Sequence, residues 1–325
     1  NIFQQKENLM TTFDIFVDSA ANLTDDMVRE TGIKVIPFHY IIDGVEKPCY
    51  DESRPFDEVA KEFYTLLASG KDIKTSLVCE ADFIEAMTPS LESGKDVMLV
   101  TITESLSGTY AQAVKAATVL KEKYPDRKIS VFDSANASLG EGLLAYSAAK
   151  LRDGGASFED CEKWLDENTY FVNSYVTVND LKYLRKGGRV STVAAVAGAL
   201  LNIKPMLKAD GASPATLAVY AKERGRLKSV SALVSAFTKH VKNAEEQTVY
   251  ITHGDCEDEA KALAEKFREL GAKDVVCEYY DLCTGSHVGP GTLAIFFMGG
   301  DRRTPEQVAT QKKRILFLRR KSAKN

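Results

Sequence analysis

The chain has 325 residues, of which 44% are apolar and 27% charged, and its formal net charge is −4. This length exceeds the usual size of one hydrophobic core, so two domains are expected. The slightly acidic balance gives no reason to expect a nucleic-acid surface. The longest weakly polar run, 193–203, is too short to span a bilayer, so no integral membrane segment is expected.

The first half alternates strand-like and helix-like patterns, as in a parallel sheet with helices on both faces. We therefore predict an α/β fold with an N-terminal α/β domain over residues 10–168. Met10 resembles a natural start, so no structural prediction is based on residues 1–9. The predicted strands are 13–17, 33–41, 97–103 and 129–133, and the predicted helices are 24–31, 55–69, 81–92, 109–123, 138–152 and 157–167.

The second half predicts a C-terminal α/β domain over residues 169–300, followed by a basic extension, 301–325. After Asp301, nine Lys and Arg stand against the single acid Glu306. A solvated helix, a frayed terminus, and a docking surface for an acidic partner or an anionic membrane all fit this charge. The predicted strands are 170–178, 203–208, 216–221, 248–252, 275–280 and 292–297, and the predicted helices are 179–186, 191–201, 227–242 and 257–270.

The segment 96–110 (DVMLVTITESLSGTY) is the most informative part of the chain, because a buried strand runs through a hydroxyl-rich turn into a helix. Ser107, Gly108 and Thr109 therefore lie at a helix N-terminus. There the unpaired backbone N–H groups and the helix dipole favour a carboxylate or phosphate. A plain N-cap role for Ser107 explains the same pattern. Both interpretations stay open on this segment alone.

Other polar turns follow the predicted strands, at the edge where open α/β sheets bind ligands. Asp18 and Ser19 follow the first strand, Asp133 and Ser134 follow the fourth, and 74–76 (KTS) is interpreted as a polar turn before a helix. Each is a weak signal alone, because Ser and Thr favour turns anyway. Two neighbouring turns that supply donors to one anion would be more specific.

In the second half, 186–191 (KGGRVS) fits either a helix C-cap or a guanidinium site. His287 is predicted in a glycine-rich loop ahead of a strand, and His253 at a strand end, where either could be structural. The four histidines lack zinc-site spacing, so no metal is predicted. Six scattered cysteines without a CxxC pair are interpreted as reduced thiols, and no signal pattern is visible at the start, which together predict a cytoplasmic protein.

No GxSxG elbow, GxxxxGK[ST] loop or GxGxxG turn after a strand is present, which counts against common serine hydrolases, nucleotide kinases and dinucleotide enzymes. Reasoning from the residues alone ends at a two-domain α/β protein that binds a small anion. A set of ordered motifs goes further and resembles the DegV family over about residues 10–300. These motifs are FVDSAANL (16–23), KTS (74–76), LSGTY (106–110), DS (133–134), VNDLKYLRKGGRVS (178–191), LLNIKPML (200–207) and HVGPGT (287–292).

The resemblance implies a protein that holds a long-chain fatty acid, such as hexadecanoate, in a pocket at the domain interface. Thr75 and Ser107 match the positions that hold the carboxylate. Some family members resemble the binding subunit of a fatty acid kinase, which presents the acid to a partner kinase. The resemblance implies no catalytic residue and no cofactor. It adds four possible contacts with the ligand or with the partner in phosphotransfer: Gly108, Thr109, Arg224 and His287.

The sequence departs from the family pattern in three places, one of which is the tail beyond Gly300, which is extended relative to the family. The segment 209–223 is longer than the usual hairpin, so Arg224 and Arg226 compete for the family's arginine position. The proline that usually follows the TS turn is absent, since the chain reads TSLVCE there. Two other functions remain as alternatives: an acyl-transfer enzyme with Ser107 as nucleophile and His287 as base, and a binder of small phosphorylated ligands.

Overall fold

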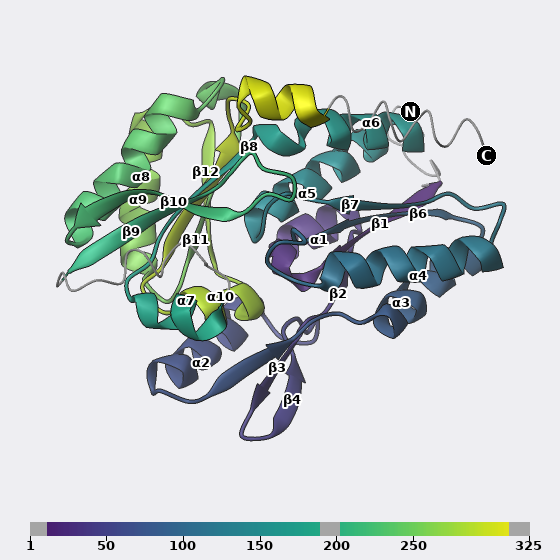
Figure 1. Cartoon of the computed structure of the whole chain (residues 1–325), viewed down its shortest axis with the longest axis horizontal. Coiled ribbons are helices and arrows are strands. Elements are labelled where there is room, and N and C mark those ends of the chain that lie inside the picture. The colour runs from purple at the N-terminus through teal and green to yellow at the C-terminus, as the bar shows by residue number, and fades with distance from the viewer. Residues whose placement is uncertain (1–11, 189–201, 312–325) are drawn as a thin grey trace, which may run out of the picture.

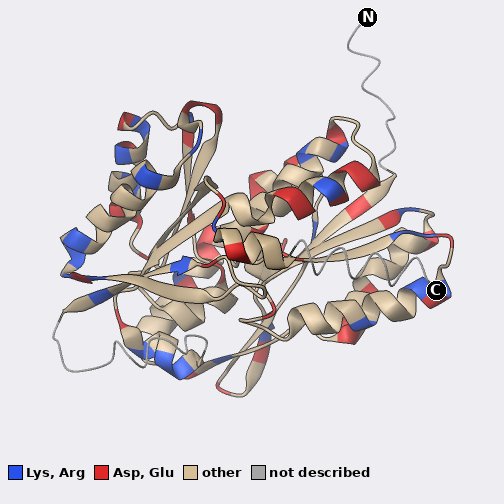
Figure 2. Cartoon of the chain, turned by 45° about the horizontal axis from the view of Figure 1, so that its top comes forward, with Lys and Arg blue, Asp and Glu red and all other residues tan. Residues whose placement is uncertain are grey.

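The computed structural model describes residues 12–188 and 202–311, and within these ranges it contains three sheets. Figure 1 shows two larger α/β units side by side, with a small sheet below them. Figure 2 shows charges of both signs interspersed over both units. No helix in the described ranges is both long and apolar enough to cross a membrane.

The first sheet has four parallel strands in the order β2-β1-β6-β7. Its central strands are buried except at Asp96, and both faces of each strand are covered, which is why residues 15–17 and 97–100 form apolar runs rather than alternate. The predicted parallel sheet with flanking helices is confirmed. The strands are β1 (Phe13–Asp18), β2 (Lys34–Ile36), β6 (Asp96–Thr101) and β7 (Ile129–Asp133).

Helices cover both faces of this sheet, with α3 and α4 on one face and α1, α5 and α6 on the other (Figure 1). Local signals fix several of their ends. Thr24 caps α1, and Ser157 forms a capping box with Asp160 at the start of α6. The bounds are α1 (Asp25–Thr31), α3 (Glu80–Glu92), α4 (Thr109–Lys123), α5 (Leu139–Asp153) and α6 (Phe158–Asn168).

The second large sheet has six strands in the order β10-β9-β8-β13-β11-β12, of which only the β11–β12 pair is parallel. Helices α8 and α9 pack on one face, and α5 of the first unit packs against β8 and β13. The strands are β8 (Val172–Thr177), β9 (Ile203–Ala209), β10 (Leu217–Arg224), β11 (Thr248–His253), β12 (Asp274–Tyr279) and β13 (Leu293–Met298). The helices are α7 (Leu181–Gly187), α8 (Arg226–His240), α9 (Glu257–Glu269) and α10 (Leu282–Val288), with short 3-10 turns at Ser19–Ala21, Thr169–Phe171 and Ala244–Glu246.

The small sheet corrects the prediction of one strand over 33–41. The chain instead forms β2, breaks at Pro37, which has no N–H to donate, and continues as β3 (His39–Ile42) in a different sheet. Strand β3 pairs with β4 (Val45–Pro48) across a turn in which Asp43 and Gly44 both have positive φ, a hairpin signal that the sequence prediction missed. Helix α2 (Phe56–Ala68) follows and contacts β12 and α10.

Two further predictions are wrong. The predicted turn 74–76 is the end of strand β5 (Ile73–Ser76), which pairs with β3 because its backbone completes the small sheet. The predicted loop around His287 is helix α10, whose N-cap is Asp281. The predicted helix 191–201 lies outside the described residues. The predicted division into domains at residues 168 and 169 stays a prediction.

Candidate functional site

An open pocket, here called the outer pocket, lies where β5, the N-terminus of α4 and α10 meet. It has about 980 Å³ of unfilled space, its mouth included. Its lining combines both halves of the chain, and Leu77 at the pocket is 39% exposed. The residues used below are Thr75, Leu77, Ser107, Gly108, Cys283 and His287.

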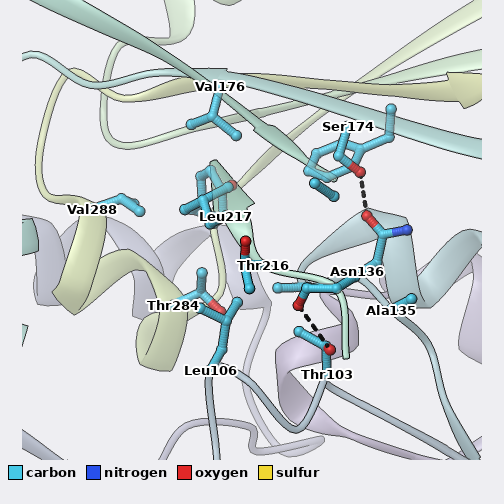
Figure 3. Close-up of a pocket in the computed structure, with 15 residues that line it drawn as sticks. Thr103, Leu106, Ala135, Asn136, Ser174, Val176, Thr216, Leu217, Thr284 and Val288 are labelled. Atoms are coloured by element: carbon cyan, nitrogen blue, oxygen red, sulfur yellow. Dashed lines mark hydrogen bonds between the residues drawn. The ribbon is translucent and has the colours of Figure 1, made fainter. Parts of the chain in front are cut away.

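A second cavity, the inner pocket, adjoins the outer one, since Leu106, Leu217, Thr284 and Val288 line both. It has about 470 Å³ of unfilled space. Figure 3 shows Leu106, Leu217 and Val288 around this space. The rest of its lining is mostly apolar and includes the half-buried Ala137 and the buried residues Ala135, Val176, Ala209, Ala215 and Phe296. The two pockets together therefore combine hydroxyl groups with an apolar end.

Thr75 and His287 meet in the outer pocket although 212 positions separate them. Thr75 is held by its strand, where it pairs with Tyr40 of β3, and His287 is held near the end of α10. The Oγ1 atom of Thr75 lies 2.9 Å from Nε2 of His287. The predicted site residues Thr75 and His287 are therefore neighbours.

Ser107 and Gly108 line the same pocket at the start of α4, as the sequence predicted for a helix N-terminus. The N-cap of α4 is Gly108, without a side-chain cap. Ser107 Oγ lies 2.8 Å from Oγ1 of Thr109 and accepts from Thr109 N–H at 3.3 Å. Ser107 thus has a partial capping role and still faces the pocket, whereas Thr109 is fully buried behind it.

Two other predicted residues lie away from these pockets. Arg224 ends β10, seven positions along the strand from the pocket residue Leu217, which is about 23 Å of extended chain. The competing Arg226 pairs with Glu259 at 2.6 Å. His253 is buried, with its ring 4.4 Å from that of Tyr279, and burial lowers the pKa of His253 to about 4.

Side chains of the polar turns after β1 and β7 accept hydrogen bonds from backbone N–H groups and do not line the outer pocket. Ser19 Oγ accepts from the N–H of Phe38, an outer-pocket residue, at 2.9 Å. Asp18 accepts from the N–H of Ile102, another outer-pocket residue, at 2.9 Å. Asp133 accepts from Ala135 N–H at 2.8 Å. These side chains therefore position the loops that form the site.

Asn22 of the FVDSAANL motif links the two halves of the chain. Its Oδ1 accepts from Ser138 Oγ at 2.9 Å and from Asp281 N–H at 2.8 Å, and its Nδ2 donates to Tyr279 O at 2.9 Å. Asp281 in turn caps α10 by accepting from Thr284 N–H at 2.7 Å. Because α10 carries His287, this buried network sets the position of the outer pocket's histidine.

Close packing around α10 requires two glycines. A Cβ added to Gly187 of the KGGR motif would lie 2.4 Å from Nδ1 of His287, and one added to Gly285 would lie 2.0 Å from the hydroxyl oxygen of Tyr64. Tyr64 is fully buried on α2 and donates to Tyr280 O at 3.2 Å, so it has little room to move. Both glycines therefore allow neighbouring elements to approach α10.

We expect Gly285→Ala to lower the free energy of unfolding by about 1–3 kcal/mol, because the added methyl group overpacks the α2–α10 contact. Urea unfolding of the two proteins measures the difference. Gly300→Ala is the matched control, since nothing lies within 4 Å of a Cβ there, and its effect should stay within about 0.5 kcal/mol. Equal stability of the Gly285 variant and its parent would contradict this packing argument.

The electrostatics of the outer pocket differ from those of a nucleophile site. Cys283 is buried, and burial raises the pKa of its thiol well above the ordinary value, so the thiol stays protonated and unreactive. The described lining residues include no Lys or Arg. A carboxylate in this pocket would therefore rely on hydroxyl, imidazole and backbone N–H donors of the described chain.

A model of the uncharacterised-protein family DegV matches residues 12–299 of this chain. The chain belongs to the DegV family. It is 39% identical over 297 residues to a DegV domain-containing protein of Clostridium perfringens. The alignment covers 91% of this chain and all of the relative. The resemblance predicted from the motifs is confirmed.

Solved DegV structures share the fold described above. A fatty-acid-binding DegV protein of Thermus thermophilus is 25% identical, with a TM-score of 0.76, and covers 88% of this chain and 98% of that one. A protein of Thermotoga maritima, whose structure revealed a fatty acid binding function, is 28% identical with a TM-score of 0.72 at the same coverages. The α/β architecture is therefore that of the DegV family.

Several pocket residues of this DegV protein were missed by the sequence prediction. Cys283, Thr284 and Val288 escaped because the segment was interpreted as a loop, whereas Asp281 followed by apolar residues at helical spacing is a usable helix start. Leu217 escaped because nothing local distinguishes it from the rest of its strand. The pocket thus contains more of α10 than the motifs indicated.

Proposed function

We propose that this DegV protein binds a long-chain fatty acid non-covalently, with the carboxylate at Thr75 and Ser107 and the alkyl chain in the inner pocket. One observation carries the proposal: a hydroxyl-lined pocket adjoins a second, mostly apolar pocket that shares four of its lining residues. An amphipathic ligand with one polar end and a long apolar chain matches that polarity. Fatty acid binding by the two solved relatives supports the same ligand class.

The alkyl chain provides most of the proposed binding energy. Burying about 14 methylene groups, as in hexadecanoate, at ~0.8 kcal/mol each gives roughly 11 kcal/mol of gross transfer energy. The net value is smaller, because association costs translational and rotational freedom. The inner-pocket residues Leu106, Val176 and Phe296 would contact the chain.

The carboxylate must be satisfied because a desolvated charge without donors is strongly unfavourable. The hydroxyls of Thr75 and Ser107 and the backbone N–H groups at Gly108 are the proposed donors, with His287 beside Thr75. The N-terminus of the 15-residue helix α4 adds a favourable dipole. Thr109 and Arg224 are not proposed as direct contacts of the ligand, since neither lines the outer pocket.

We also propose that the protein presents the bound acid to a separate kinase and does not catalyse turnover itself. Hydroxyl donors leave a carboxylate oxygen free to attack a phosphoryl group, since no fixed cation of the described lining pairs with it. Arg224, exposed at the end of β10, remains a proposed contact for such a partner. A cytoplasmic location remains a prediction from the sequence.

The two alternatives fit the pockets less well. An acyl-transfer enzyme needs an activated nucleophile, whereas Ser107 Oγ lies 2.8 Å from Oγ1 of the fully buried Thr109 and Nε2 of His287 lies 2.9 Å from Oγ1 of Thr75. A small phosphorylated ligand would leave the apolar inner pocket unused. Both observations favour a fatty acid.

Analysis of the ligand that copurifies with the protein tests the proposal. We expect native mass spectrometry to show an adduct of fatty-acid mass that disappears on denaturation, and gas chromatography of the extract to identify the acid. Retention of the added mass after denaturation would instead indicate an acyl-enzyme. A phosphorylated polar compound, or failure of the delipidated protein to take up any fatty acid, would contradict the proposal.

A further inference from the structure

The link between β9 and β10, residues 210–216, is here called the closing loop because it closes the apolar end of the inner pocket. Ala215 and Thr216 of the loop line that pocket, and Ala215 is 1% exposed. The carboxylate of Asp210 organises the loop, since it accepts from Thr216 N–H at 2.8 Å and Thr216 Oγ1 at 2.7 Å. The loop is therefore a built structure and part of the pocket wall.

The first half of the chain holds the closing loop from outside. The carbonyl oxygen of Ala215 accepts from Ser105 Oγ at 2.5 Å and from Thr103 Oγ1 at 3.3 Å. The hydroxyl of Tyr170 donates to Ala212 O at 3.3 Å. These bonds join the loop to the segment after β6 and to the turn before β8. The end of the pocket thus depends on contacts between distant segments.

Arg302 joins three parts of this wall with one guanidinium. Its Nη1 donates to Asp210 O at 2.7 Å, and its Nη2 donates to Ala135 O at 3.1 Å and to Thr169 O at 3.2 Å. Burial of this guanidinium lowers the pKa of Arg302 to about 10. Ala135 itself lines the inner pocket. The guanidinium therefore fixes the distance between two walls of the cavity.

The backbone beside Arg302 packs closely against the loop. A Cβ added to Gly211 would lie 2.6 Å from Arg302 O and 2.5 Å from Cα of Arg303. The family match ends at residue 299, and Arg302 and Arg303 lie just beyond it.

An open groove lies on the other side of the same wall. It has about 1120 Å³ of unfilled space and is lined by Ala135, Tyr170, Ser213, Pro214 and Arg303. Because Ala135 lines both the groove and the inner pocket, movement of the closing loop away from it would connect the two spaces. The end of a longer alkyl chain would then have room.

We propose that Arg302 is a positioning residue that holds the closing loop against Ala135 and thereby limits the length of the acyl chain that the inner pocket accepts. The proposal rests on the proposed binding of a fatty acid. Arg302 acts through backbone carbonyls, so its removal changes the shape of the pocket and leaves Thr75 and Ser107 in place.

Competition among acids of graded length tests the proposal. The delipidated protein is incubated with an equimolar mixture of straight-chain saturated acids, and the bound fraction is analysed by gas chromatography. In Arg302→Met we expect the ratio of an acid two methylenes longer to the acid preferred by the parent to rise about tenfold, which is the discrimination that two buried methylenes provide. Arg29→Met is the matched control, because Arg29 is exposed on α1, pairs with Asp26 and lines neither pocket nor the groove.

Two more variants keep the test decisive if Arg302→Met folds poorly. Ser105→Ala removes another bond to the loop and should shift the preference in the same direction, whereas Ala215→Val narrows the cavity and should shift it toward shorter acids. If folded Arg302→Met keeps the parent's chain-length preference, the proposed role of Arg302 is overturned, but fatty acid binding is not. If Arg302→Met does not fold, an unchanged chain-length preference in Ser105→Ala has the same meaning. Absence of bound acid in the parent would overturn the proposed function as well.

Discussion

Replacing Thr75 by valine and Ser107 by alanine in one protein should weaken fatty acid binding by between about 10²- and 10⁴-fold. A hydrogen bond to a charged group contributes about 1.5–3 kcal/mol, and two such bonds to the carboxylate would be lost. Valine keeps the shape of threonine at β5, so the fold should persist. Displacement of a fluorescent fatty acid from the delipidated protein measures the change.

Ser76→Ala is the control for this pair, because Ser76 also lines the outer pocket but its hydroxyl donates to Glu46 at 3.0 Å. Its affinity should match that of the parent. The methyl ester of the same acid provides a second comparison, since it keeps the alkyl chain and lacks the charge. The parent should prefer the acid strongly, whereas the double variant should show a much smaller preference, because the backbone N–H groups at Gly108 and the α4 dipole remain. Near-parental affinity of the double variant would remove both hydroxyls from the proposed site.

The delipidated protein should lose stability as the pH rises from about 4 to about 7. Asp18 and Asp281 are fully buried, and burial raises the pKa of each to about 7. Their stabilising contribution is complete below the unfolded-state pKa of about 4 and is lost as the pH rises through about 7, because the unfolded chain releases these protons earlier. A pKa rise from about 4 to about 7 corresponds to roughly 4 kcal/mol in the free energy of unfolding for one carboxyl group. The contributions of the two groups are not additive, because Asp18 also raises the pKa of Asp281.

Urea unfolding at a series of pH values measures this trend, and Glu141→Gln provides the control for its cause. Glu141 is fully buried, its oxygens have no hydrogen-bond partner in the described part of the chain, and burial raises its pKa well above the ordinary value. Glutamine resembles the protonated acid and cannot ionise. The variant should therefore be more stable than the parent at pH above about 7 and show a weaker pH dependence. A flat profile in the parent would contradict the buried-carboxyl explanation.

The sequence determined the elements whose signals are local. Helix 109–123 and strand 129–133 were predicted with the bounds that the structure gives, because apolar spacing and end signals lie within the segments themselves. Ser107 and Gly108 were placed correctly at the start of that helix for the same reason. The ordered motifs also identified the family, since residues far apart in the chain recur together in it.

Tertiary structure decided how the pocket is assembled. Lys74, Thr75 and Ser76 form a strand because β3 offers them a partner, and short polar segments carry no such information themselves. The contact between Thr75 and His287 joins positions 212 residues apart, and Arg302 bonds to a loop 92 residues away. Such contacts depend on how finished elements pack, so no local pattern encodes them. The residues Thr75, Ser107 and His287 were therefore named from the sequence, whereas the contact between Thr75 and His287 and the wall formed by the closing loop required the fold.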